Sequence, residues 1–170
     1  MATLVLVIDA SDRPGIVTTV SSAFTDLGGT RVGAEVARFG GRVAGLVLVE
    51  VPDAAEAALR EAMAALCDGT DLRVEVHRAG RAPDLADLVH VEINGPDQPG
   101  ILGDVVKHFE DLGVSVDSLR NVAYDLPDSS GPFFGADMVL EVPEGVTIDA
   151  IRESITQVGE HITLDVISEE

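Results

Sequence analysis

The sequence predicts an α/β (α+β) fold made of two tandem βαββαβ units, each a two-layer sandwich of one sheet and two helices. Three observations predict it. The chain repeats itself once, its apolar residues switch between strand spacing and helix spacing, and 46% of its 170 residues are hydrophobic. This length suits two small domains of about 80 residues each.

The internal repeat fixes how the two units correspond. Residues 12–28 recur as residues 97–113 at an offset of 85, with nine of seventeen positions identical. Residues 50–53 recur as residues 141–144 at an offset of 91. The offset grows by six, so the second copy has a longer connection between its second and third strands. Its residues 125–132 are rich in Pro, Gly, Ser and Asp, which favour turns.

In the first copy, alternating apolar residues predict strands, and apolar residues three or four apart predict helices. The predicted strands are 3–10, 31–39, 42–51 and 72–78, and the predicted helices are 14–27 and 54–66. Pro14 would occupy the first helical position, where its missing N–H costs nothing. Gly28 follows the last helical residue, and the Gly40-Gly41 pair predicts a hairpin turn.

The second copy follows the same plan. Its predicted strands are 88–94, 114–124, 134–142 and 162–168, and its predicted helices are 101–112 and 148–158. The order βαββαβ, with both helices on one side of the sheet, is typical of a ferredoxin-like sandwich. We therefore expect a first domain at residues 1–79, a linker at 80–87 and a second domain at 88–170.

Charge narrows the classes of partner. The chain has 11 lysine and arginine residues against 30 acidic ones, a formal net charge of −19. Nucleic acids and anionic membranes attract clustered cations, so neither is expected as a partner. Residues 1–82 have 8 basic and 11 acidic side chains, whereas residues 83–170 have 3 and 19. A single cysteine, Cys67, and the absence of a signal-peptide pattern predict a cytoplasmic protein.

The best chemical signal is the loop between the first strand and the first helix, Asp-x-Pro-Gly-Ile in both copies. Gly15 and Gly100 have no side chain, so an anion such as a carboxylate can approach the free N–H groups of the helix start. Asp12 and Asp97 can accept a hydrogen bond from an ammonium group. The pattern fits a free amino acid. It also fits a simpler role in which each Asp caps the helix and each Gly eases a tight turn.

Other chemistry is not indicated. The four histidines lack the short spacing of a metal site, so neither a metal nor a cofactor is expected. No nucleophile elbow, P-loop or dinucleotide fingerprint is present, and we do not expect an enzyme.

With these features in view, the chain resembles the ACT domain family, specifically tandem-ACT proteins of the glycine cleavage system transcriptional repressor type. The segments 8–16 and 93–101, each followed by an amphipathic helix ending in Leu-Gly, carry the resemblance. The resemblance implies amino-acid binding where two domains pair, between this loop and the second strand of a neighbour. The implied residues of the first copy are Asp12, Arg13, Gly15, Ile16, Val32, Gly33 and Ala34. Those of the second copy are Asn94, Asp97, Gln98, Gly100, Ile101, Leu102, Asp117, Ser118, Leu119 and Asn121.

The leading hypothesis is a stand-alone regulatory sensor whose effector is a free amino acid, with the second copy as the better site because its second strand is more polar. The acidic residues Asp104, Asp117, Asp125 and Asp128 would favour a cationic amino acid if the 125–132 insertion folds over that site.

We expect a homo-oligomer, a dimer formed by ACT pairing, with the exposed Val5 and Val7 of the first copy as a contact. The alternative is an interaction module that binds a transcription factor or metabolic enzyme without any ligand.

Overall fold

The computed structural model describes residues 1–80, 87–125, 131–159 and 161–169. The chain divides into two compact units, Met1–Ala82 and Pro83–Glu170. Most of the expected linker (residues 81–86) and the centre of the expected insertion (residues 126–130, Asp128 among them) lie outside the described residues.

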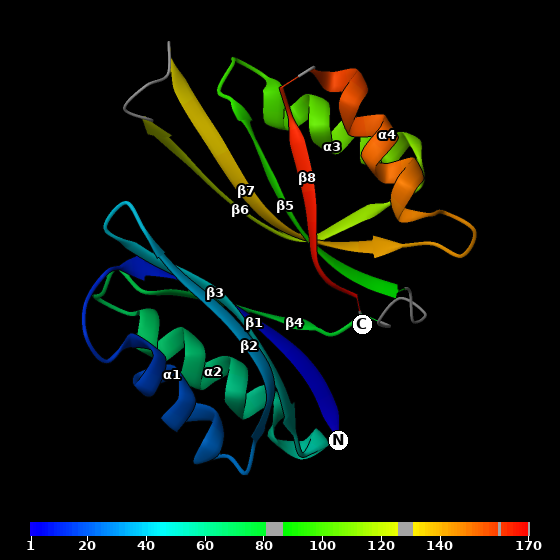
Figure 1. Cartoon of the computed structure of the whole chain (residues 1–170). Coiled ribbons are helices and arrows are strands. Elements are labelled where there is room, and N and C mark those ends of the chain that lie inside the picture. Colours follow the sequence, from blue (N-terminus) through cyan, green and yellow to red (C-terminus); the bar gives the residue numbers. More distant parts are fainter. Residues whose placement is uncertain (81–86, 126–130, 160, 170) are drawn as a thin grey trace. The chain divides into compact units, whose positions relative to one another are not determined.

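Unit 1 runs strand, helix, strand, strand, helix, strand, with a short 3₁₀ turn, η1, before the second helix (Figure 1). Its elements are β1 (Ala2–Ser11), α1 (Ile16–Thr25), β2 (Thr30–Phe39), β3 (Arg42–Val51), η1 (Asp53–Ala55), α2 (Glu56–Cys67) and β4 (Arg73–Arg78).

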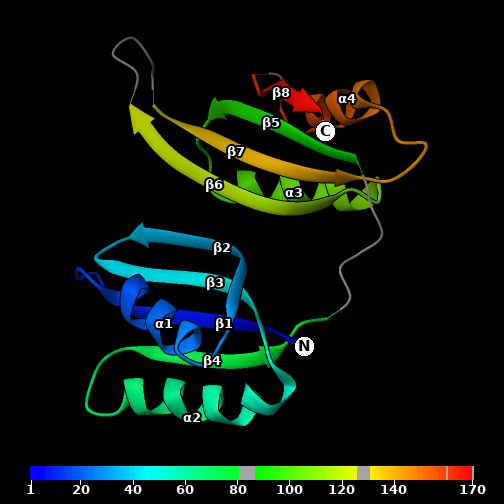
Figure 2. The same cartoon turned by 90° about the horizontal axis from the view of Figure 1, so that it is seen from below.

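Unit 2 repeats this order. Its elements are β5 (Asp87–Pro96), α3 (Ile101–Asp111), β6 (Ser115–Asp125), β7 (Pro132–Val142), α4 (Ile148–Val158) and β8 (Thr163–Glu169). The strand orders are β2-β3-β1-β4 and β6-β7-β5-β8, and every neighbouring pair is antiparallel. In each unit both helices cover one face of the sheet, and the other face is open (Figure 2). The expected pair of ferredoxin-like sandwiches is confirmed.

Each unit has its own aliphatic core between sheet and helices. Along β1, every second side chain (Leu4, Leu6, Ile8) is at most 2% exposed. These side chains meet Leu59 and Met63 of α2, which are fully buried. The core of unit 2 has the same plan around β5 and includes two phenylalanines, Phe109 and Phe134. Burial of one face of each central strand therefore holds the helices to the sheet.

The start of α1 differs from the prediction, whereas α3 begins at Ile101 as predicted. Pro14 is not the first helical residue, because α1 begins at Ile16. Gly15 comes between them with φ +93°, a left-handed conformation that interrupts the helical backbone. Gly100 has the same role before α3, with φ +89°. Both glycines are there because a residue with a side chain adopts this conformation at a cost. The Gly28 helix end and the Gly40-Gly41 turn, all at positive φ, are confirmed.

A charged cluster ties α2 to β4. The Glu56 carboxylate accepts hydrogen bonds from Arg78 at 2.8 Å and from Arg60 at 3.0 Å. These bonds, the one from Arg78 first, lower the pKa of Glu56 below its ordinary value.

We predict that Glu56→Gln destabilises unit 1 at neutral pH and loses this effect in acid. Because the folded pKa is lowered, the carboxylate stabilises the fold above its unfolded pKa, and this stabilisation disappears as the pH falls through the folded pKa. Thermal unfolding of both proteins from pH 7 to pH 3 measures the difference. Glu61→Gln on the same helix is the matched control, since Glu61 has no ion pair among the described residues. An equal difference at every pH would contradict the prediction.

Candidate functional site

The loop before α3 leaves backbone donors free. Asp104 N–H bonds to the Gly100 carbonyl at 3.0 Å, and Ile101 N–H bonds to the Gln98 carbonyl at 3.1 Å. The N–H groups of Leu102 and Gly103 have no backbone acceptor among the described residues, and no side chain caps the helix. Such donors at a helix start, with the positive end of the helix dipole, favour an anion.

A surface hollow of about 470 Å³ opens beside these donors, within unit 2. Residues of the loop, the first turn of α3, β6 and β7 line it. They are Asp97, Gln98, Pro99, Gly100, Ile101, Leu102, Gly103, Asn121 and Pro132. Six of the residues expected at the second-copy site therefore meet around one hollow, where a carboxylate, an amide and free N–H groups are together.

The Asp97 carboxylate has no ion pair within 4 Å among the described residues, and its own N–H bonds to the Pro132 carbonyl at 2.8 Å. Its counterpart Asp12 is different. There, Arg38 on β2 donates from Nε to the Asp12 Oδ1 at 2.9 Å. The loop aspartate is thus neutralised in unit 1, whereas in unit 2 it faces the hollow without a cation.

Other groups at the unit 1 loop also have partners within the same unit. Asp71, just before β4, accepts the Ser11 N–H at 2.7 Å and lies 3.6 Å from an Arg13 nitrogen. Hydrogen bonding to Ser11, with a smaller contribution from Arg13, lowers the pKa of Asp71. Of the other expected residues, Gly15 is exposed at the loop and Ile16 is 5% exposed in the core.

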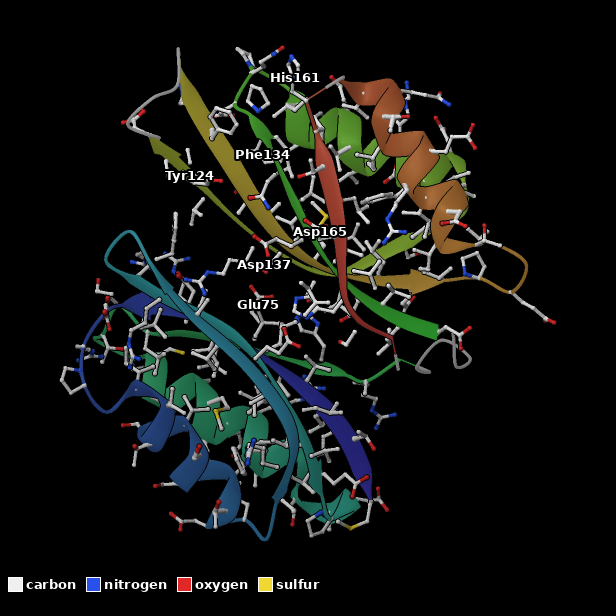
Figure 3. The ribbon with its side chains drawn as sticks, viewed as in Figure 1. Glu75, Tyr124, Phe134, Asp137, His161 and Asp165 are labelled. Carbon is white, nitrogen blue, oxygen red and sulfur yellow. The ribbon has the colours of Figure 1, made fainter. Side chains whose placement is uncertain are left out.

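Asn94 lies on the open face of the unit 2 sheet, not at the hollow. Its side chain accepts from the Tyr124 hydroxyl at 3.2 Å and donates to Glu92 at 3.0 Å. Tyr124, labelled in Figure 3, reaches Asn94 across Gly135, where a Cβ would lie only 3.3 Å from the tyrosine ring. This contact between Tyr124 and Asn94 was not predicted from the sequence, because it depends on how three strands pair.

The remaining second-strand residues are dispersed. Asp117 lies at an irregularity in the β6–β7 register, with Ser118 and Leu119 following it, and none of the three lines the hollow. Val32 and Gly33 lie at the matching irregularity of β2, and Ala34 borders a different hollow on the unit 1 sheet. Asp104 and Asp125, expected to favour a cationic ligand, are exposed and do not line the unit 2 hollow.

The open faces of the two sheets differ in kind. At the centre of unit 1, Val7 lies between Leu46 and Glu75 on neighbouring strands. At the same place in unit 2, Glu92 lies between Asp137 and Asp165 (labelled in Figure 3). At its centre, the open face of unit 1 therefore has apolar residues on two of three strands, whereas that of unit 2 has a carboxylate on all three.

Two further features bear on the chemistry available. Over the described residues, no group of three His, Cys, Asp or Glu side chains is arranged to hold a metal ion. None of the described helices has the length and apolar character needed to cross a bilayer.

Comparisons with known proteins agree with the fold. Residues 3–77 match the model of the ACT domain family. No curated protein sequence matches the chain. A solved structure of an unknown protein from Galdieria sulphuraria superposes with a TM-score of 0.84 at 20% identity, covering 98% of this chain and 99% of that one. The structure of a "putative glycine cleavage system transcriptional repressor" superposes with a TM-score of 0.73 at 20% identity, covering 98% of both chains.

These two structures share the whole two-unit architecture, and at such identity they support the fold alone. The family match covers the first unit, whose βαββαβ order, loop glycine and sheet order recur in the second. Residues 3–77 are therefore similar to the ACT domain family, and the second half of the chain repeats the fold of the first.

Proposed function

We propose that this chain is a non-catalytic regulatory protein that binds a free amino acid at the unit 2 hollow. The observation that carries the proposal is the Asp97 carboxylate, without an ion pair among the described residues, beside N–H groups of Leu102 and Gly103 that have no acceptor in that part of the chain. An amino acid has one anionic and one cationic group on a single carbon, and this pair of features complements both.

The α-carboxylate would accept from the helix start, and the α-ammonium would donate to Asp97. The Asn121 side chain, on the wall formed by β6, offers a further amide donor and acceptor. The side chain of the ligand would extend along the open part of the hollow, whose described residues do not select one amino acid. ACT pairing would bring a neighbouring domain over the hollow, so binding would shift an oligomer or expose a partner surface.

A thermal-shift screen of the full chain against the twenty common amino acids tests the proposal. A compound that binds only the folded state stabilises it by about 2.7 kcal/mol at one hundred times its Kd, so we expect a clear rise in unfolding temperature with at least one of them. At about 10 mM, even a ligand with a Kd of about 1 mM would stabilise the folded state by about 1.4 kcal/mol, so the proposal is wrong if none of them raises the unfolding temperature at that concentration.

A second candidate function is a ligand-independent interaction module, and one observation favours it. On the open face of unit 1, Val7 is 36% exposed and Leu46 is 52% exposed. They border a shallow hollow of about 760 Å³. Exposed apolar area of this kind marks protein contacts, including contacts between copies of one chain.

We predict that Asp97→Asn weakens binding of the stabilising amino acid about tenfold, because it removes the charge that accepts the ammonium group. Calorimetric titration measures the affinity. Asp111→Asn, at the other end of α3, removes the same charge from the same helix and should leave the affinity unchanged. Under the second candidate function, both variants and the native chain would bind no amino acid.

We predict that Leu46→Asp weakens self-association of the chain, because a carboxylate would be buried in an apolar contact. Sedimentation velocity over a range of protein concentrations measures it. Ile167→Asp is the control, an equally exposed apolar residue (54%) of unit 2. If both variants associate like the native chain, the open face of unit 1 is not the contact between copies.

A further inference from the structure

We infer that Arg38 occupies the loop of unit 1 in place of a ligand, so that the chain binds one amino acid, at unit 2, although both units have the same loop. This inference rests on the proposed function. It adds a stoichiometry and names Arg38 and Ala123 as the positions that decide which copy binds.

The geometry of unit 1 is the first step. The Arg38 guanidinium donates to the Asp12 carboxylate at 2.9 Å, which is the contact proposed for a ligand ammonium at Asp97. Arg38 lies on β2, and Asp12 directly follows β1 of the same unit, so this pairing is intramolecular and does not depend on any concentration. A free amino acid would have to displace the arginine before it could reach Asp12.

Strand register is the second step. Arg38 is paired with Val43 across β2 and β3, and Ala123 is paired with Phe134 across β6 and β7. The repeat offset of 85 makes Ala123 the counterpart of Arg38, and the offset of 91 makes Phe134 the counterpart of Val43. Ala123 shares a face of β6 with Asn121, two residues away, and Asn121 lines the hollow. Its side chain ends at Cβ and supplies no cation to Asp97.

The second ion pair of the unit 1 loop is also missing from unit 2. Arg13 lies 3.6 Å from Asp71. The counterpart of Arg13 in unit 2 is Gln98. From the pairing of β1 with β4 and of β5 with β8, the counterpart of Asp71 is His161, labelled in Figure 3. Both arginines that form ion pairs at this loop in unit 1 are therefore replaced in unit 2, by Gln98 and Ala123, and no cation of the described residues pairs with Asp97 there.

Nuclear magnetic resonance of the ¹⁵N-labelled full chain tests which loop binds. Glycine, L-serine and L-arginine are titrated separately, and the amide signals of Gly15 and Gly100 report on the two loops. In the native chain we expect a saturable shift at Gly100 and none at Gly15. In Arg38→Ala we expect a saturable shift at Gly15 in addition. In Ala123→Arg we expect the affinity at Gly100 to fall about tenfold, because the new arginine competes for Asp97.

Arg42→Ala is the matched control. It removes another arginine of the same hairpin, one that pairs with Asp9 rather than Asp12, and should leave Gly15 unresponsive. A response at Gly15 in the native chain, or no response there in Arg38→Ala, would overturn the inference and leave the proposed function standing. If neither these three compounds nor any amino acid that raises the unfolding temperature shifts either signal in any of the proteins, both are wrong. Should Ala123→Arg not fold, Arg38→Ala decides the matter alone.

Discussion

Each unit depends on one constraint, which is that only one face of its sheet is buried. The helices of a unit cover a single face of its sheet, so the central strand β1 has a buried row, Leu4, Leu6 and Ile8, and an open row. The chain must turn from the end of that strand back across the sheet within a few residues. The left-handed glycine makes this turn, and as a result it leaves a helix N-terminus at the strand end. The helix N-terminus at the candidate site therefore follows from the way in which the chain has to turn here.

Because the backbone is the same in both units, the differences between them lie in side chains. Unit 1 has arginines at the loop and apolar residues on its open face, whereas unit 2 has an unpaired carboxylate at the loop and acidic residues on its open face. The loop aspartate therefore has a cation beside it in unit 1 and none among the described residues in unit 2, which favours a cationic partner there.

The repeat and the apolar periodicity were enough to predict the fold, because a strand under two helices needs a regular apolar row. The Asp97 loop and Asn121 were both predicted as site residues, but as parts of two paired domains, whereas they line one hollow within unit 2. The positions of Asn94 and Arg38 could not be predicted. Whether Asn94 faces the hollow or the open sheet depends on strand alternation at the last residues of β5, and the Arg38 contact depends on a register shift in β2. The start of α1 was misplaced because Pro14 suits a helix start as well as the turn before it.

The two hydrophobic cores are built from separate sets of residues, one in each half of the chain. A substitution inside one core costs stability there and leaves the packing of the other intact. Because the two cores share no residue, side chains at the loop of one unit can change without altering the packed core of the other. The chain is in this sense pre-adapted to evolve new specificity.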